Sequence, residues 1–513
     1  MRPLILIAAA LTCAGAEPAK DINQAWSEVL GQASTVRPTV LSPIENRAEN
    51  RPGADFLNHL FLQSRTEYIR EQTSFTGLPT LSGVINATPG ESANAAGIPY
   101  PGAFQPSANR VYEMLNFGMR GWLSPRLDSN FTIRYQQDLT PVDSSSPALN
   151  LLNTFPHNRR IELLDASVDI HGLSGTNVRV GRQYIYGAEL AAFDGASISF
   201  EHSRYSMTLY GGRRFSLYAD PVQRAIGGGN FRVRLNDSSS LEYDALWYVR
   251  ASQSLTYRKR FYRNWFLTAY FRTVGGSPVD LSSQLLYLSA SGKTTARVAF
   301  FQKLSSKDFF YDYTTTARDL DPHNPISRLN LGPISPYTQV AIDAHRAVWP
   351  RLRVGGLIWI RRLNDSSEQS AFNTSFADWR LNAQVFALRK TEFDVEFHQH
   401  NSHRSSPSGA VLFDDISRSG ETRIQDITAE VRRPFAEGRL TLSAGGFYRR
   451  LDFQDQFRAI KNAHDRGLLG SAWYRIDPKT RLWFDYSLDN DYAVFRPDIR
   501  HSTILRLGLD WKY

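Results

Sequence analysis

The sequence contains almost no cysteine. Its single cysteine, Cys13, lies in a segment that resembles a secretory signal, with Arg2, an apolar run from Leu4 to Leu11 and small residues at Ala14–Ala16. We therefore predict that residues 1–16 are a signal peptide and that Cys13 is removed with it. A mature chain without thiols excludes disulfide scaffolds, cysteine-based zinc sites and thiol catalysis.

The chain also lacks a long hydrophobic run. Past the signal, no stretch approaches the roughly 20 apolar residues that a transmembrane helix needs. Mean hydropathy is negative, yet the chain has 30 Phe, 23 Tyr and 10 Trp. Disordered chains contain few aromatic residues, whereas a membrane barrel combines a wet lumen with aromatic rims. The composition therefore favours a β-barrel.

An acidic excess is absent as well, since 59 Lys and Arg face 50 Asp and Glu, giving a net charge of +9. The basic residues are scattered along the chain, and a secreted protein rarely meets nucleic acid. We therefore expect no nucleic-acid partner.

The last nine residues alternate strictly between apolar and polar side chains. The apolar positions are Leu505, Leu507, Leu509, Trp511 and Tyr513, and the others are Arg506, Gly508, Asp510 and Lys512. A barrel strand needs such a pattern, because lipid covers one face and water the other, although a soluble sandwich edge would show it too. The strand also resembles the C-terminal aromatic signal of outer-membrane barrels, which implies binding to the barrel-assembly machinery through the strand ending at Tyr513.

Short strands begin near Leu57 and continue to the end, with short polar turns and long polar connections alternating between them. The long connections are 73–108, 139–159, 305–335, 364–375, 403–421, 453–465 and 489–500. In a bacterial outer-membrane barrel, the short turns are periplasmic and the long loops extracellular, and the strand number is even. We predict an all-β fold, a transmembrane antiparallel β-barrel of about 22 strands (roughly 18–24 would fit) over residues 55–513. Residues 17–54 would form a periplasmic N-terminal arm or a small plug.

A barrel of this size encloses more space than side chains can fill, so its polar face must line a wet lumen. Arginine dominates that face, and guanidinium groups bind carboxylates and phosphates by paired hydrogen bonds. We predict that solutes contact Arg134, Arg179, Arg182, Arg232, Arg234, Arg353, Arg361, Arg380 and Arg506. The alternative is that these arginines pair with lumenal acids and brace the wall. Acids cluster at 242–244 and 394–430, and basic residues at 232–234 and 353–361, which predicts a lumen polarised across its section.

One segment resembles a known group of proteins. Residues 180–187, Val-Gly-Arg-Gln-Tyr-Ile-Tyr-Gly, are followed by Phe-Asp-Gly-Ala at 193–196. This is similar to the outer-membrane porin superfamily that includes alginate-export channels, which carry Gly-Arg-Gln…Gly at the end of one strand and Phe-Asp-Gly at the start of the next. The resemblance implies passive passage of a polar or anionic solute, with Arg182 near the constriction. The residues themselves predict a β-bulge at Gly181-Arg182 that re-aims the arginine.

The remaining candidate chemistry is weaker. His398, His400 and His403, with Asp394 and Glu396 nearby, would suit a metal, but the spacing is loose and more typical of a solvated strand end. No Gly-x-Ser-x-Gly elbow is present. We therefore predict no catalytic residue, no metal and no cofactor.

The sequence thus predicts a channel in the cell outer membrane, surrounded by lipid, for passive diffusion or export of small polar, mainly anionic solutes. Two alternatives stay open: a barrel that sheathes a periplasmic partner such as an electron-transfer protein, and an outer-membrane hydrolase.

Overall fold

The computed structural model describes most of the chain from residue 59 onwards. The described residues are 59–75, 107–121, 123–140, 159–173, 175–215, 225–305, 336–364, 375–387, 390–403, 421–453, 462–490 and 499–513. The predicted signal peptide and N-terminal arm lie outside these ranges.

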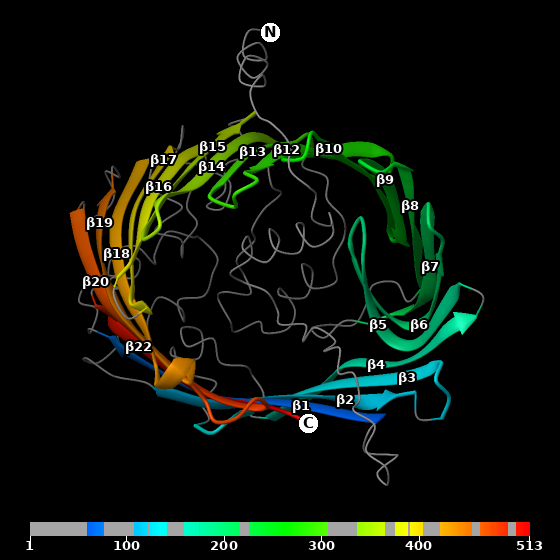
Figure 1. Ribbon diagram of the computed structural model, residues 1–513, viewed down its shortest axis with the longest axis horizontal. Coiled ribbons are helices and arrows are strands. Elements are labelled where there is room, and N and C mark those ends of the chain that lie inside the picture. Colours follow the sequence, from blue (N-terminus) through cyan, green and yellow to red (C-terminus); the bar gives the residue numbers. More distant parts are fainter. Residues whose placement is uncertain are drawn as a thin grey trace, which may run out of the picture.

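The described residues form one antiparallel sheet of 22 strands. The first eleven are β1 (Leu60–Phe75), β2 (Ser107–Arg120), β3 (Leu127–Asp138), β4 (Arg159–Leu173), β5 (Thr176–Tyr186), β6 (Leu190–Glu201), β7 (Tyr205–Arg214), β8 (Ala225–Asn236), β9 (Ser239–Tyr248), β10 (Arg250–Phe261) and β11 (Trp265–Val274). The others are β12 (Ser277–Leu288), β13 (Thr294–Lys303), β14 (Tyr337–Trp349), β15 (Leu352–Leu363), β16 (Ser375–Phe386), β17 (Glu392–His403), β18 (Glu421–Phe435), β19 (Leu440–Phe453), β20 (Asn462–Arg475), β21 (Thr480–Asn490) and β22 (Ile499–Lys512). Each strand pairs with its neighbours in sequence, and the ring of Figure 1 is the result.

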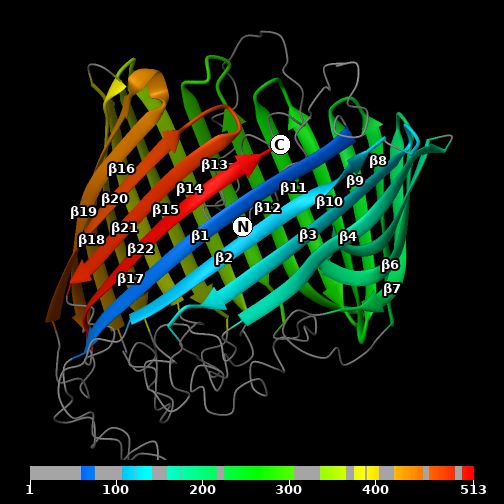
Figure 2. The ribbon, with the colours of Figure 1, turned by 90° about the horizontal axis from the view of Figure 1, so that it is seen from below.

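The C-terminal strand closes the barrel, as its alternation predicts. β22 pairs antiparallel with β1, so that Leu507 lies opposite Tyr68 and Arg506 opposite Ile69. The backbone amide of Tyr513 donates to the carbonyl oxygen of Leu62 at 2.7 Å. Figure 2 shows β1 and β22 side by side, tilted in the same sense as the other strands. The predicted transmembrane-type antiparallel barrel and its strand number are confirmed.

The two ends of the barrel differ in their connections. At the end where β1 begins, neighbouring strands are joined by short turns such as 237–238 and 476–479. In the second of these, the Lys479 backbone amide donates to the Asp477 carboxylate at 2.7 Å, which lowers the pKa of Asp477. Connections at the other end are mostly long, as predicted, but β5–β6, β9–β10 and β11–β12 are joined there by only 187–189, 249 and 275–276.

The outer face of the wall is apolar and the lumen face is polar. On the outer face, Leu507 of β22 and Ile358 of β15 are 45% and 51% exposed. The residues that follow them, Gly508 and Trp359, lie on the lumen face. Gly508 lies opposite Trp483 in the ladder, and a Cβ at residue 508 would collide with that indole ring. Among the described residues, no helix is long and apolar enough to cross a bilayer.

Candidate functional site

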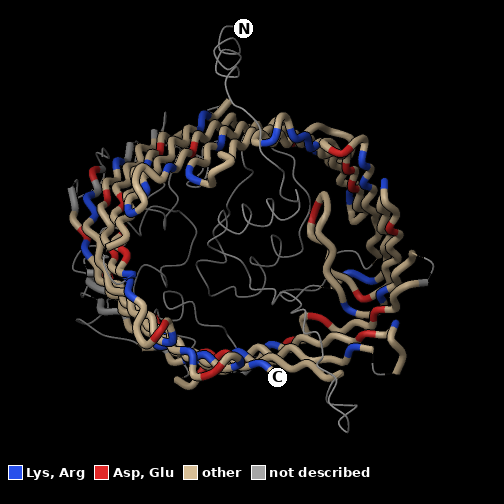
Figure 3. The backbone as a smooth tube through the Cα atoms, in the orientation of Figure 1, with Lys and Arg blue, Asp and Glu red and all other residues tan. Residues whose placement is uncertain are grey.

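Charged residues of both signs are distributed around the whole ring (Figure 3). The alternation of each strand places most of them on the lumen face, because their neighbours in sequence are the exposed apolar residues of the outer face. An arginine near the bilayer midplane on the outer face would cost about 2–4 kcal/mol, which explains this segregation. The lumen therefore carries a mixed, dense set of arginines and acids.

Five of the nine predicted arginines are held by carboxylates. Arg179 donates to both oxygens of Asp169, at 2.6 and 2.9 Å, and Arg134 Nε donates to Glu162 at 2.5 Å. The other pairs are Arg232 with Glu242 at 2.9 Å, Arg380 with Asp378 at 3.4 Å, and Arg182 with Asp194 at 2.7 Å. For Arg134, Arg179, Arg232 and Arg380 the bracing interpretation describes the observed contacts, whereas Arg182 and Asp194 share the face of Val180 and Ile198. The acids at 242–244 lie beside the basic residues at 232–234, so charge is largely balanced there.

The other four predicted arginines, Arg234, Arg353, Arg361 and Arg506, form no ion pair within the described part of the chain. Arg361 is the most distinctive of them. Its guanidinium carbon lies 4.4 Å from the ring centroid of Tyr337 and 4.8 Å from that of Phe376, and it donates to Gln339 Oε1 at 3.2 Å. On the same strand, Arg353 stacks over Phe386 at 5.0 Å. β15 therefore presents two arginines that form no ion pair with the acids the structure describes.

The hairpin of β5 and β6 leaves the wall and bends into the lumen. We call its tip, residues 183–193, the inner hairpin. Residues 183–186 pair with β6 alone, and residues 190–192 with β5 alone. Figure 1 shows this hairpin inside the ring, beside β7. The hairpin therefore narrows the lumen at the long-loop end.

A small apolar core holds the inner hairpin against the wall. Ala191 and Phe193 are fully buried, and the Phe193 ring stacks on Tyr210 with centroids 5.4 Å apart. The remaining members of this hairpin core are Ile226, Leu246, Tyr248, Val274 and Val279, with Ile185 packed against them. They come from the lumen faces of β8, β9, β11 and β12. Among the described residues, the hairpin core thus forms an apolar patch on the lumen side of the wall, covered by the inner hairpin.

An ionic latch fixes the end of the inner hairpin. The Glu189 carboxylate accepts a hydrogen bond from Ser252 Oγ on β10 at 2.9 Å and forms an ion pair with Arg272 on β11. Arg272 Nε also donates to Asp280 on β12 at 2.6 Å, and Lys303 Nζ lies 4.0 Å from the same carboxylate. Glu189, Arg272 and Asp280 are all nearly buried. None of these residues is among those predicted from the sequence to contact solutes.

Arg182 stands at the base of the inner hairpin, but not on the face that its strand presents to the lumen. The β4–β5 register continues without a shift through Gly181, so the predicted bulge is absent at this point. Gly181 instead has φ +126°, and a Cβ there would collide with the carbonyl oxygen of Ala166. Glycine allows the strand to bend rather than to insert a residue. Arg182 therefore keeps the parity of Val180, a residue of the outer face.

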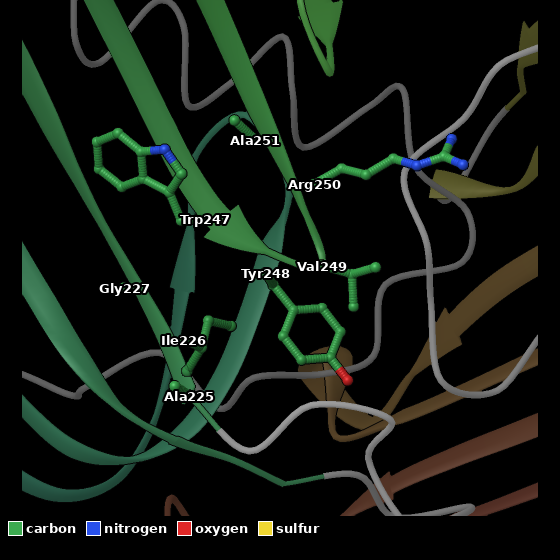
Figure 4. Close-up of a pocket in the computed structure, with 8 residues that line it drawn as sticks. All are labelled: Ala225, Ile226, Gly227, Trp247, Tyr248, Val249, Arg250 and Ala251. Atoms are coloured by element: carbon green, nitrogen blue, oxygen red, sulfur yellow. The ribbon is translucent and has the colours of Figure 1, made fainter.

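A hollow of about 440 Å³ lies at the long-loop end of β8, β9 and β10. Figure 4 shows Trp247 and Tyr248 on opposite sides of β9 in this hollow. Tyr248 belongs to the hairpin core, whereas Trp247 is exposed. The hollow therefore borders the part of the wall against which the inner hairpin packs.

Two of the three predicted histidines form a cluster with acidic residues. His398 lies between Asp378 and Asp426: its Nε2 is 2.8 Å from the Asp378 carboxylate and its Nδ1 is 2.8 Å from the Asp426 carboxylate. His400 Nδ1 lies 3.1 Å from the Asp378 carboxylate. Within the described residues, no group of His, Cys, Asp and Glu is arranged to hold a metal ion. Both histidines contact carboxylates and neither contacts a nucleophile in that part of the chain. The side chain of His403 lies outside what is described.

No protein-family model matches the sequence, and no curated protein matches it. Several solved structures are similar in fold. OccAB4 of Acinetobacter baumannii is 10% identical, with 88% of this chain and 98% of that chain covered and a TM-score of 0.39. A BenF-like porin from Pseudomonas fluorescens Pf-5 is 11% identical over 89% and 98%, with a TM-score of 0.41. The translocation pore of the P pilus usher PapC is 10% identical over 88% and 99%, with a TM-score of 0.45.

The barrel itself assigns the location. In a closed antiparallel barrel, the backbone N–H and C=O groups of each strand bond to the neighbouring strands wherever the ladder is continuous. The apolar exterior of such a barrel requires hydrocarbon around it. Such barrels are outer-membrane structures. The protein is therefore a β-barrel of the cell outer membrane, as the alternation in its sequence predicts.

Proposed function

We propose that the protein is a passive channel for small polar solutes with a preference for anions. The observation that carries this proposal is the basic surface of β15, where Arg353 and Arg361 lie on the lumen face without an acidic partner among the described residues. A guanidinium stacked on aromatic rings is held in place, and the donors of Arg361 that do not bind Gln339 can bind a carboxylate or phosphate. Binding at such a site is weak enough for release, which flux requires.

The alternatives receive less support. A sheath for a periplasmic protein needs an unobstructed lumen, whereas the inner hairpin occupies part of it. A hydrolase needs a nucleophile beside a base, and the described contacts of His398 and His400 offer none. Export of alginate or another polysaccharide stays a prediction of the sequence resemblance alone, as does recognition of the strand ending at Tyr513 by the assembly machinery.

Replacing Arg361 with Gln tests the proposal. We expect the reversal potential in a KCl gradient across a planar bilayer to move from the anion side toward zero, because the lumen loses a cation that no acid balances. Arg204→Gln removes the same charge from the exposed β6–β7 turn and serves as the control. A barrel that already prefers cations, or an equal shift in both variants, would contradict the proposal.

A further inference from the structure

The wall has a break in its hydrogen-bond ladder between β4 and β5. The ladder begins with Leu173 of β4 opposite Thr176 of β5 and ends with Ala166 of β4 opposite Arg182 of β5. Beyond this point, residues 159–163 and 165 of β4 have register partners on β3 alone, and a register shift in that ladder leaves Leu164 without one. A hydrogen bond from Arg182 Nη1 to the carbonyl oxygen of Leu163, at 3.0 Å, crosses the break. A strand edge left unpaired in hydrocarbon is costly, so this part of the wall needs another polar environment.

A charged row lies at the same place. Arg182 on β5, Asp194 on β6 and Arg213 on β7 occupy adjacent register positions and share one face of the sheet. We call these three residues the charged row. Arg182 donates to both oxygens of Asp194, at 2.7 and 2.9 Å, and its guanidinium lies 4.2 Å from the Phe215 ring centroid. Two arginines and one aspartate give the row a net positive charge.

The face that carries the charged row is the outer face of the wall. Elsewhere on the same strands it presents apolar residues, including Val180 on β5, Ile198 on β6 and the exposed Leu209 on β7. Charged side chains on a lipid face are unfavourable near the midplane and tolerated only where water or head groups reach them. The charged row and the ladder break thus independently indicate a polar opening at one point of the wall.

Apolar side chains stand on both sides of this opening. On β4, Ile161 and Leu163 are 63% and 36% exposed. On the inner hairpin, Tyr186 and Leu190 are 67% and 38% exposed, on the face opposite the buried Phe193. Because the buried face of the hairpin packs on the wall, this second face turns toward the lumen. An apolar surface therefore continues from the outside of the barrel to its inside, past a cationic row.

We propose that the gap between β4 and β5 is a lateral portal through which a single-chain amphiphile with an anionic head group passes between the lumen and the outer leaflet. Its head group would engage the charged row, because guanidinium groups bind carboxylates by paired hydrogen bonds. Its alkyl chain would follow the apolar rims on β4 and the inner hairpin. This route depends on the barrel and its membrane location, not on the anion preference of the central lumen.

Cysteine accessibility tests the portal. In a Cys13→Ser background, Leu163→Cys and Val168→Cys place thiols on the same face of β4, at residues of equal exposure (36% and 37%) in the open and the paired half of the strand. In proteoliposomes we expect a charged methanethiosulfonate to modify the thiol at 163 at least about tenfold faster, because the reactive thiolate forms only where water is present. Equal, slow reaction at both positions would overturn the portal while leaving channel conductance intact.

Protection by defined probes tests the ligand class. We expect dodecanoate to slow modification at position 163, and acetate or dodecyltrimethylammonium to do so far less, because only dodecanoate has both the chain and the anionic head. Arg213→Gln, and separately Arg182→Gln, should weaken this protection, with folding checked by heat-modifiable migration on gels. Equal protection by all three probes, or protection unaffected by either variant, would refute the anionic-amphiphile assignment.

Discussion

Replacing Arg272 with Gln is expected to release the inner hairpin and raise the single-channel conductance. Arg272 is the cation shared by Glu189 and Asp280, all three nearly buried. Removing one partner from a buried ionic cluster costs about 3–5 kcal/mol, and here Glu189 and Asp280 both lose the guanidinium that they share. This free-energy cost destabilises the conformation in which the inner hairpin is bound to the wall. Planar-bilayer recordings should therefore show a larger mean conductance and frequent transitions between levels.

A double variant separates the latch from general damage. Adding Glu189→Gln to Arg272→Gln removes the carboxylate that lost its ion pair with Arg272. This should restore part of the wild-type conductance and make the transitions rarer, a coupling that a double-mutant cycle quantifies. Arg263→Gln, in the exposed β10–β11 turn, removes the same charge without touching the latch. Wild-type conductance in Arg272→Gln would show that the hairpin does not limit flow.

The second large effect is expected at the lipid face. Leu507→Arg places a guanidinium among the exposed apolar residues of β22. We expect it to lower the free energy of unfolding by about 2–4 kcal/mol, the cost of an arginine on the lipid face near the midplane. Urea unfolding of the barrel in lipid vesicles, followed by tryptophan fluorescence, measures this change. Ser487→Arg on the lumen face of the neighbouring strand β21 is the matched control. Equal destabilisation by the two variants would contradict the assignment of the faces.

Much of the wall is readable from the sequence because a barrel strand obeys one simple rule. From Leu505 to Tyr513 each odd position is apolar, and the structure places Leu507 on the exposed face opposite Tyr68 of β1. The polar connections are equally legible, because turns and loops need polar, flexible residues. Parity does not distinguish inside from outside, but the number of strands does, since a wide barrel must hold water.

The bend of the inner hairpin is not predictable by the same rule, although it leaves a trace. On β6 the apolar parity changes, from Ala191 and Phe193 to Ile198 and Phe200, without an inserted residue in the ladder. On β9 both parities are apolar near the long-loop end, with Tyr248 buried and Trp247 exposed. A two-sided apolar segment in a barrel strand indicates a second layer inside the wall. Which segment supplies that layer depends on contacts distant in sequence.

Which arginines pair with acids also depends on the fold and not on the sequence pattern alone. The cross-strand neighbours of Arg179 and Arg361 follow from register, and register places Asp169 beside the first and Gln339 beside the second. Sequence alone gives both arginines the same polar parity. The distinction between a wall brace and a free cation therefore emerges only once the strands are aligned.

The latch also has a consequence for the order in which the barrel matures. Glu189 and Arg272 are 83 residues apart, and contacts between distant segments form late because closing a long chain segment is entropically costly. With insertion in chain order, β5 and β6 would be in place before their anchor on β11 exists. The nascent protein would thus pass through a stage with a wide mouth, and the final narrowing would be a maturation step that follows insertion of β11.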